Sequence, residues 1–328
     1  MLDFLKKWIR RNRLLYAVSR AIYGSLVLRF ADEKGFTRYR LTKVLKMLSA
    51  LVTREGLVGG LMTDEGDYYL RMPDGILVFY NTLHPQYTPG DGQNLEFKAG
   101  MPTLDLEQFV RRHLSNEAVY FDVGANNGYF YCLKVAHTYP RCRIHAFEPD
   151  ARILGALRRN IAINGAANVT VAPVALSNFA GVGSMPAYLG ASGYLVSDRR
   201  ATVLVVDVEV TTLDRYARQH GIERLDVVKV DIEGGEYRFL QGAQETLGTL
   251  RPLVVMELRD DLLRRSQASE REVIALWRHL GYVGYRVAAT ADAIFLPEER
   301  SAGLFAANRS WLQPLESARR ETIDEGIA

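Results

Sequence analysis

A run of small and polar residues, Asp122-Val-Gly-Ala-Asn-Asn-Gly128, lies between an apolar stretch and a helical one. Gly124 allows the chain to turn tightly, and Gly128 allows it to pass close to a ligand at a helix N-terminus. A dinucleotide-binding loop has the pattern G-x-G-x-x-G, but Asn126 stands here in place of the middle glycine. The loop therefore favours a ligand without a pyrophosphate, whose amino-acid end meets Asp122 and backbone groups.

A second candidate for ligand binding is Glu148, which follows the next apolar run, twenty residues after Gly128. A carboxylate at this place accepts hydrogen bonds from both ribose hydroxyls of a nucleoside. Each feature has a structural alternative, because the glycines also suit a plain strand-to-helix connection and Glu148 also suits a charge at a helix start. Their occurrence together, after successive predicted strands, favours a nucleoside site.

Four carboxylates follow two further apolar runs: Asp231, Glu233 and Glu236 after one, and Glu257 after the other. Like charges crowded together raise one another's pKa, which suits a general base, and carboxylate oxygens also bind divalent cations. Asp231, Glu233 and Glu257 are therefore the candidate catalytic residues and also the candidate metal ligands. The alternative for Glu233 and Glu236 is a pair of charges that stabilise a helix N-terminus. Lys229 lies inside an apolar run, and we expect Asp122 or Glu257 to be its partner.

The elements that must position these residues alternate between strand and helix. Asp150 is placed to cap the helix after the second predicted strand. Strands that are apolar throughout are buried on both faces, so we expect a parallel sheet between helices, with the strands' carboxyl ends on one edge. This pattern predicts an α/β, Rossmann-like fold. The predicted strands span residues 119–123, 143–147, 169–176, 226–230, 253–256 and 282–287, with 203–210 as an added arm, and the main helices span 104–114, 151–164 and 269–280.

The first hundred residues have a different pattern. Residues 2–30 carry apolar positions at helical spacing, interrupted by arginines, which predicts one or two amphipathic helices, and residues 41–52 predict another. Tyr68–Met72 and Ile76–Asn81 flank the turn Pro73-Asp74-Gly75, which predicts a β-hairpin. We therefore divide the chain into an accessory region (1–100), a ligand-binding domain (101–312) and a C-terminal tail (313–328).

Several short motifs follow one another in a fixed order along the chain. They are Phe121-Asp122-Val-Gly-Ala-Asn-Asn-Gly-Tyr129, Phe147-Glu148-Pro149, Asn160-Ile-Ala-Ile-Asn164, Ala175-Leu-Ser177, Lys229-Val-Asp-Ile-Glu-Gly-Gly-Glu236, Gly242-Ala243 and Arg251-Pro252 with Glu257. In this order they resemble the FkbM family of methyltransferases. The resemblance covers roughly residues 118–290, and the accessory region lies outside it. It implies a class I methyltransferase fold, with helices on both faces of the sheet, and S-adenosylmethionine as the methyl donor.

Carried over by position, the resemblance assigns a part of the cofactor to each motif. Asp122, Gly124 and Asn126 would hold the methionine end, Glu148 the ribose, and the region of Ser177 would lie near adenine. The family usually methylates a hydroxyl of a sugar or polyketide, so we expect an O-methyltransferase acting on a glycan or a related natural product. The Asn-Pro-Pro-aromatic run common in amino-group methyltransferases is absent after residue 230, where Asp-Ile-Glu-Gly stands instead.

The net charge of +3 hides an asymmetry along the chain. Residues 1–46 contain twelve Lys and Arg but only three acidic residues, a local net charge of +9, so the remaining residues carry −6. A basic head on an acidic body indicates a membrane surface or a polyanion as its neighbour. We expect residues 2–30 to lie on an anionic membrane, and the alternative is that they pack on the domain or on a second subunit.

Two other function classes compete with a glycan O-methyltransferase. One is an RNA-modifying methyltransferase that grips nucleic acid with its basic head, which the acidic body disfavours. The other is a membrane-peripheral protein that binds a nucleoside without catalysis. No secretory signal or membrane-spanning window is visible, so we expect a cytoplasmic protein. We also expect the uncharged stretch Gly181–Ser197 to be a lid on the acceptor side or an ordinary insertion.

Overall fold

The computed structural model describes residues 60–62, 68–72, 74–80, 103–186, 195, 205–288 and 290–315. These residues belong to the larger of two compact units, which comprises residues 58–81 and 86–328. The predicted helices at residues 2–30 and 41–52 lie outside the described residues. Among the residues that the structure describes, no helix is long and apolar enough to cross a membrane.

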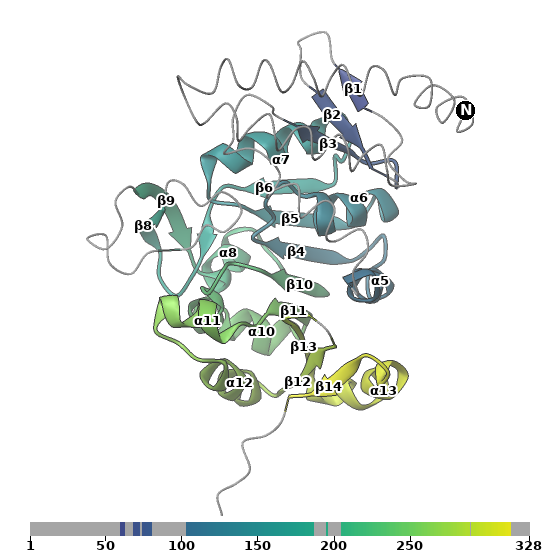
Figure 1. The fold of residues 1–328 in the computed structure, drawn as a ribbon. Helices are drawn as coiled ribbons and strands as arrows, with labels where there is room; N and C mark the ends of the chain where they lie inside the picture. Colours follow the sequence, from purple (N-terminus) through teal and green to yellow (C-terminus); the bar gives the residue numbers. More distant parts are fainter. Residues whose placement is uncertain are drawn as a thin grey trace, which may run out of the picture. The chain divides into compact units, whose positions relative to one another are not determined.

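An eight-stranded sheet forms the centre of this unit, with the strand order β14-β12-β13-β11-β10-β4-β5-β6 (Figure 1). The five strands from β11 to β6 pair in parallel, whereas β13, β12 and β14 add antiparallel pairs at one edge. The strands are β4 (Val119–Val123), β5 (Arg143–Phe147), β6 (Val169–Ala172), β10 (Val227–Val230), β11 (Leu253–Glu257), β12 (Tyr282–Val287), β13 (Asp292–Pro297) and β14 (Leu312–Pro314).

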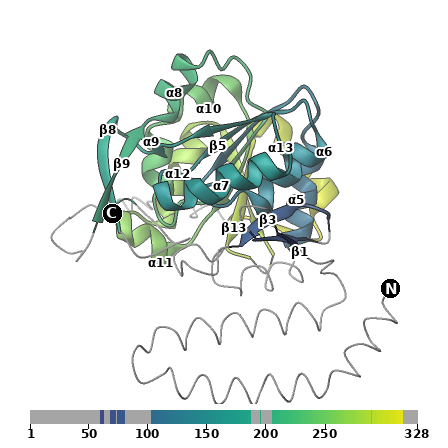
Figure 2. The same ribbon diagram turned by 90° about the horizontal axis from the view of Figure 1, so that it is seen from above.

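Helices cover both faces of this sheet, as the Rossmann-like prediction requires. Figure 2 shows α8 and α10 on one face and α5 and α6 on the other. The helices are α5 (Thr103–Arg112), the π-helix η2 (Tyr129–Leu133), α6 (Lys134–Thr138), α7 (Ala151–Ile163), α8 (Leu213–Gln219), α9 (Glu236–Gln241), α10 (Gln244–Leu250), α11 (Asp260–Leu263), the 3-10 helix η5 (Arg264–Ser266), α12 (Glu270–His279) and α13 (Glu298–Asn308). The predicted cap at Asp150 is present, since Asp150 accepts the N–H of Arg152. The structure also shows a capping box at the start of α12, between Ser269 and Glu272.

The buried faces of the central strands explain why they pair in parallel. β4 and β10 are buried at every position, so neither face is left for water. Their side chains pack into one hydrophobic cluster with those of the helices, and the Trp277 ring stacks on Phe295 at 4.7 Å. In the parallel register Lys229 lies beside Asp122. The carboxyl ends of β4, β5, β10 and β11 therefore meet at one edge.

The third predicted strand, 169–176, divides into two elements. β6 ends at Ala172, and β7 (Ala175–Leu176) belongs to a second sheet with β9 (Val205–Thr211) and β8 (Gly181–Pro186). Pro173 lies between them, and it has no N–H to continue a ladder. Part of the stretch predicted as a lid is thus the strand β8, paired antiparallel with β9. The sequence prediction also missed β13, which inserts between β11 and β12.

The predicted hairpin is present, as β2 (Tyr68–Arg71) and β3 (Leu77–Tyr80), joined at the turn that contains Asp74 and Gly75. A third short strand, β1 (Gly60–Met62), pairs with β2. Tyr69 and Leu77 are buried against Ala156 of α7. The hairpin therefore packs on the helix that follows Glu148.

Candidate active site

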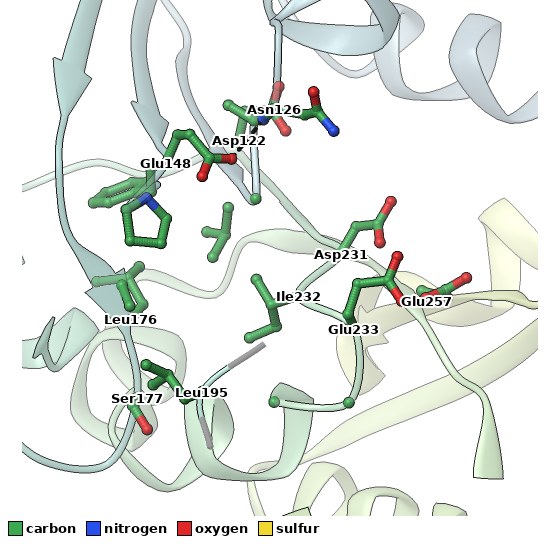
Figure 3. Close-up of a pocket in the computed structure, with 18 of the residues that line it drawn as sticks. Asp122, Asn126, Glu148, Leu176, Ser177, Leu195, Asp231, Ile232, Glu233 and Glu257 are labelled. Atoms are coloured by element: carbon green, nitrogen blue, oxygen red, sulfur yellow. Dashed lines mark hydrogen bonds between the residues drawn. The ribbon is translucent and has the colours of Figure 1, made fainter. Parts of the chain in front are cut away.

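A cavity of about 360 Å³ opens at the carboxyl ends of β4, β5, β10 and β11. This is the edge at which α/β sheets bind ligands. Figure 3 shows three groups of side chains around it. Asp122, Asn126 and Glu148 form a polar group, Asp231, Glu233 and Glu257 an acidic group, and Leu176, Ser177 and Leu195 lie with Ile232 in a largely apolar group.

The glycine loop is held in a conformation that other residues rarely adopt. Gly124, Asn126 and Gly128 all have a positive φ, of 80°, 52° and 80°. A Cβ on Gly124 would lie 1.9 Å from the carbonyl oxygen of Asp231, so only glycine lets β4 and β10 approach here. Gly128, which the sequence predicted to lie close to the ligand, does not line the cavity. A Cβ on Gly128 would lie 2.7 Å from Cδ1 of Leu157 in α7. Gly128 thus serves the packing of the loop on α7.

Glu148 is buried and lines the cavity. Its Oε2 accepts the N–H of Asn126 at 3.0 Å, and its Oε1 accepts the N–H of Asp150 at 2.9 Å. Burial raises the pKa of Glu148 to about 7, against the opposing effect of these two N–H groups. A carboxylate has about four acceptor positions, so both oxygens retain lone pairs for ligand hydroxyls.

Asp122 lies in the floor of the cavity, only 2% exposed. Its Oδ2 accepts the N–H of Cys132, from the first turn after the glycine loop, at 3.1 Å. The side chain of Asp122 thus ties the end of β4 to the helical segment that follows the loop. Its negative charge faces the same cavity as Glu148.

The acidic group brings together the three predicted catalytic carboxylates. Asp231, Glu233 and Glu257 each place an oxygen within 4.8 Å of the other two. Burial and the charges of Asp231 and Glu233 raise the pKa of Glu257 to about 8. Glu233 has a positive φ of 57°, so the loop after β10 turns its side chain to the side where Glu257 ends β11.

Two cations offset part of this negative charge. Arg265 lies 3.7 Å from Oε2 of Glu233, and Nζ of Lys229 lies 2.9 Å from Oδ2 of Asp231. The expected partner of Lys229, Asp122 or Glu257, was therefore wrong. Asp231 lies two residues further along the chain, directly after β10, where its carboxylate is within hydrogen-bond distance of the Lys229 ammonium. Burial lowers the pKa of Lys229, but the charges of Asp231 and Asp122 outweigh it and raise the pKa above its usual value.

Glu236 does not line the cavity, although it lies close to Glu233 in sequence. Its Oε1 accepts the N–H groups of Ile232 and Gly234, both at 3.2 Å. Burial raises the pKa of Glu236 to about 7. The side chain fixes the loop that carries Asp231 and Glu233, which supports the structural alternative for this residue.

The apolar group lies at the third side of the cavity. Val174, Leu176, Met185, Leu195 and Ile232 line it. Ser177 also lines it, and the chain is close-packed here, because a Cβ on Gly242 would lie 2.0 Å from the carbonyl oxygen of Ser177. Met185 of β8 and Leu195 belong to the stretch predicted as a lid on the acceptor side. In the structure, Met185 and Leu195 line the cavity together with Leu176 and Ser177, near the residues that the resemblance places beside adenine.

Several residues of the site were missed from the sequence. Phe130 and Tyr131 line the cavity from the π-helix, and the Lys229 ammonium lies 5.3 Å from the Tyr131 ring centroid. Arg238 of α9 also lines the cavity. Arg265 reaches Glu233 from η5. No pattern of spacing marks these residues, because they come from elements that only the fold brings to the cavity.

The sequence matches the methyltransferase FkbM domain over residues 122–283. Residues 122–283 therefore carry a methyltransferase FkbM domain. The matched residues contain the glycine loop, Glu148 and all three carboxylates of the acidic group, whereas the hairpin lies outside them. The predicted resemblance is thus confirmed.

Curated relatives of this FkbM domain come from a fungus and from bacteria. Methyltransferase sdnD of Sordaria araneosa is 31% identical, over 42% of this chain and 64% of its own length. The 31-O-demethyl-FK506 methyltransferase FkbM of Streptomyces tacrolimicus is 29% identical, over 55% of this chain and 77% of its own length. This chain therefore spans less than two thirds of sdnD.

A solved structure described as methyltransferase FkbM from Methylobacillus flagellatus KT aligns with a TM-score of 0.39 and 18% identity. The alignment covers 56% of this chain and 44% of that one. The class I arrangement of the FkbM domain rests on its own strand order and on the helices that cover both faces of its sheet.

Proposed function

We propose that the protein transfers a methyl group from S-adenosylmethionine to a hydroxyl of a carbohydrate or a related natural product. The observation that carries this proposal is the cavity itself, in which a carboxylate, a glycine loop and an apolar wall lie together. The apolar wall near Ser177 suits adenine, Glu148 suits the ribose hydroxyls, and Asp122 suits the methionine ammonium. Each part of the cofactor thus meets a group of matching chemistry.

When bound, S-adenosylmethionine supplies a methyl group activated by a sulfonium. The chain must align the acceptor with that methyl group and remove the proton of the acceptor hydroxyl. Asp231, Glu233 and Glu257 are the carboxylates available for this step. Lys229 holds Asp231 and Arg265 contacts Glu233, so both side chains are oriented before an acceptor arrives. In the described part of the chain, Oε2 of Glu257 is buried without a hydrogen-bond partner.

The same three carboxylates are close enough to hold a divalent cation. Lys229 and Arg265 already neutralise two of the three charges, which favours proton transfer and orientation over metal binding. Chelation separates the two roles. If the carboxylates act without a metal, a chelator leaves the turnover of the purified protein unchanged. A loss of turnover that Mg²⁺ or Mn²⁺ restores would assign them to a metal.

Two observations favour a hydroxyl over an amine as the acceptor. The chain has Asp-Ile-Glu-Gly after β10, in place of the Asn-Pro-Pro-aromatic run of amino-group methyltransferases. The name of the Streptomyces tacrolimicus relative describes methylation at an oxygen of FK506. The test is to supply methyl-labelled S-adenosylmethionine with glycans, polyketides and amines, and to locate the label by mass spectrometry. A product with the label on nitrogen would overturn the proposal.

Binding of the cofactor is tested separately from the acceptor. Glu148→Ala removes two hydrogen bonds between a carboxylate and the ribose, so we expect S-adenosylhomocysteine to bind at least tenfold more weakly in calorimetric titration. Glu272→Ala is a matched control, because Glu272 caps α12 away from the cavity. Affinity unchanged in Glu148→Ala would contradict the ribose assignment, and no binding to the wild type would contradict the proposed function.

A further inference from the structure

Two asparagines lie four positions apart at the end of α7, Asn160 within the helix and Asn164 as its C-cap residue. They are the ends of the motif Asn160-Ile-Ala-Ile-Asn164, to which the proposed chemistry gives no role. Asn160 has no exposed surface. Its Nδ2 donates to the carbonyl oxygen of Asn127 at 2.8 Å. Asn160 therefore holds the glycine loop by a hydrogen bond to its backbone, and Asn160 itself does not line the cavity.

The contact between Asn160 and Asn127 extends along the loop. Oδ1 of Asn127 accepts the N–H of Tyr129 at 3.0 Å. Leu157 of α7 packs beside Gly128, where an added Cβ would lie 2.7 Å from the Leu157 Cδ1 atom. Gly124, Asn126 and Gly128 of this loop have a positive φ, which glycine adopts readily and asparagine adopts less often. Two side chains of α7 contact the loop next to these residues, Asn160 at the carbonyl of Asn127 and Leu157 at Gly128.

Asn164 binds the hairpin instead of the loop. Its Oδ1 accepts the N–H of Leu77 at 2.8 Å, and its Nδ2 donates to the Leu77 carbonyl oxygen at 2.7 Å. The side-chain amide thus pairs with β3 as a neighbouring strand would. The same Nδ2 also donates to the carbonyl oxygen of Asn160 at 2.7 Å, which links the two asparagines directly.

A second contact joins the hairpin to the loop. Asp74, in the turn between β2 and β3, accepts the hydroxyl of Tyr129 at 3.4 Å and lies 3.9 Å from Nζ of Lys134. Tyr129 and Lys134 belong to the helical segment that begins directly after Gly128. The hairpin therefore contacts both the end of α7 and the helical segment η2–α6, which follows the glycine loop.

We propose that the β2–β3 hairpin is a positioning element of the cofactor site and that Asn160 and Asn164 are the positioning residues that connect it to the glycine loop. This inference rests on the proposed function and extends the site to residues outside the matched FkbM domain. A loop fixed before binding loses less conformational freedom when the ligand arrives, so the hairpin raises the affinity for the cofactor.

Asn164→Ala is the decisive variant, because Asn164 touches neither the cavity nor the loop. Asn168→Ala is its matched control. Nδ2 of Asn168 also donates to two backbone carbonyls, of Tyr139 at 3.1 Å and Cys142 at 2.9 Å, but these lie away from the hairpin. In the full chain, we expect Asn164→Ala to weaken S-adenosylhomocysteine binding about three- to tenfold, and Asn168→Ala to leave it within twofold.

Hydrogen exchange of the ligand-free protein gives a second readout. Asn164→Ala should speed the exchange of the amides of residues 126–133, although the substitution lies elsewhere, whereas Asn168→Ala should not. Equal affinity and equal loop exchange in both variants would overturn the proposal, as would equal losses in both, which would show only general destabilisation. If Asn164→Ala fails to fold, Asn164→Asp, which keeps the acceptor for Leu77, carries the same test with a smaller expected change.

The two proposals fail in different ways. If the wild type binds no S-adenosylhomocysteine, the proposed function is wrong, and the exchange measurement still tests the link between hairpin and loop. If the wild type binds and Asn164→Ala behaves like Asn168→Ala, the positioning role alone is wrong.

Discussion

The carboxylates at the acidic end of this site are of two kinds, those that face the cavity and one that holds the loop. Asp231 and Glu233 face the cavity, whereas Glu236 turns inward and binds two backbone N–H groups of the loop. These residues lie within six positions of one another, and the backbone between them has a positive φ at both Glu233 and Gly234. Substitutions at the two kinds of position should therefore affect different measurements.

The ligand-facing pair should control the rate. Asp231→Asn and Glu233→Gln each remove a carboxylate that can accept the acceptor proton, so turnover should fall about 10²–10⁴-fold. Affinity for S-adenosylmethionine should stay within a few-fold, because neither residue is assigned to the ribose. Steady-state kinetics measures the turnover, and calorimetry measures the affinity for S-adenosylmethionine. If both variants keep wild-type turnover, the catalytic role passes to Glu257.

Glu236 should control stability and its dependence on pH. Its pKa is raised to about 7 in the folded state by burial. The protonated form therefore stabilises the fold fully below the unfolded pKa of about 4.5, and this contribution is lost as the pH rises through 7. Glu236→Gln keeps an acceptor oxygen without the charge. Its free energy of unfolding, relative to the wild type, should rise from pH 5 to pH 8 by up to about 3 kcal/mol.

Denaturant unfolding at several pH values measures this difference. Glu245→Gln is a matched control, since Glu245 is exposed and pairs with Arg218 on the surface. A difference between Glu236→Gln and the wild type that does not change with pH would contradict the role given to burial.

At the scale of elements, the close approach of β4 and β10 shapes the floor of the site. In Gly124→Ala the new Cβ would meet the Asp231 carbonyl at 1.9 Å, and φ is unfavourable there, so both the strand ends and the glycine loop must shift. We expect the loss of S-adenosylhomocysteine binding and a free energy of unfolding lower by about 1–3 kcal/mol. Calorimetry and denaturant unfolding check these effects.

Gly155→Ala is the control for this prediction. Gly155 lies inside α7, where an added Cβ meets nothing within 4 Å. Alanine is favoured over glycine in a helix, so this variant should gain about 0.5–1 kcal/mol in stability and keep its affinity. Similar behaviour of the two alanine variants would show that space at position 124 is not limiting.

At the scale of the whole molecule, the distribution of charge separates the first residues from the rest. The segment 1–46 has a net charge of +9 and the remainder −6. If residues 2–30 bind an anionic membrane, sedimentation with liposomes should increase with the fraction of anionic lipid and should fall about tenfold or more at high salt, where exposed charges are screened. Liposome binding that changes with neither the anionic lipid content nor the salt concentration would favour the alternative, in which residues 2–30 pack on the domain or on a second subunit.

Much of the fold followed from the sequence because its signals are local. Apolar runs located β4, β5, β10 and β11 to within a residue, and the cap at Asp150 and the hairpin turn at Asp74 were each visible in a few neighbouring residues. β13 was missed because it joins the sheet between β11 and β12, a choice made by pairing with distant strands.

By itself, the sequence determined the FkbM resemblance, the glycine loop and the places of the carboxylates, because residue type and spacing along strands specify them. Only the tertiary structure decided which partner each charge takes. Lys229 binds Asp231, Glu236 binds its own loop, and Asn164 binds Leu77, 87 positions away. Such pairings depend on distances between side chains after the chain has packed, and no local pattern encodes those distances.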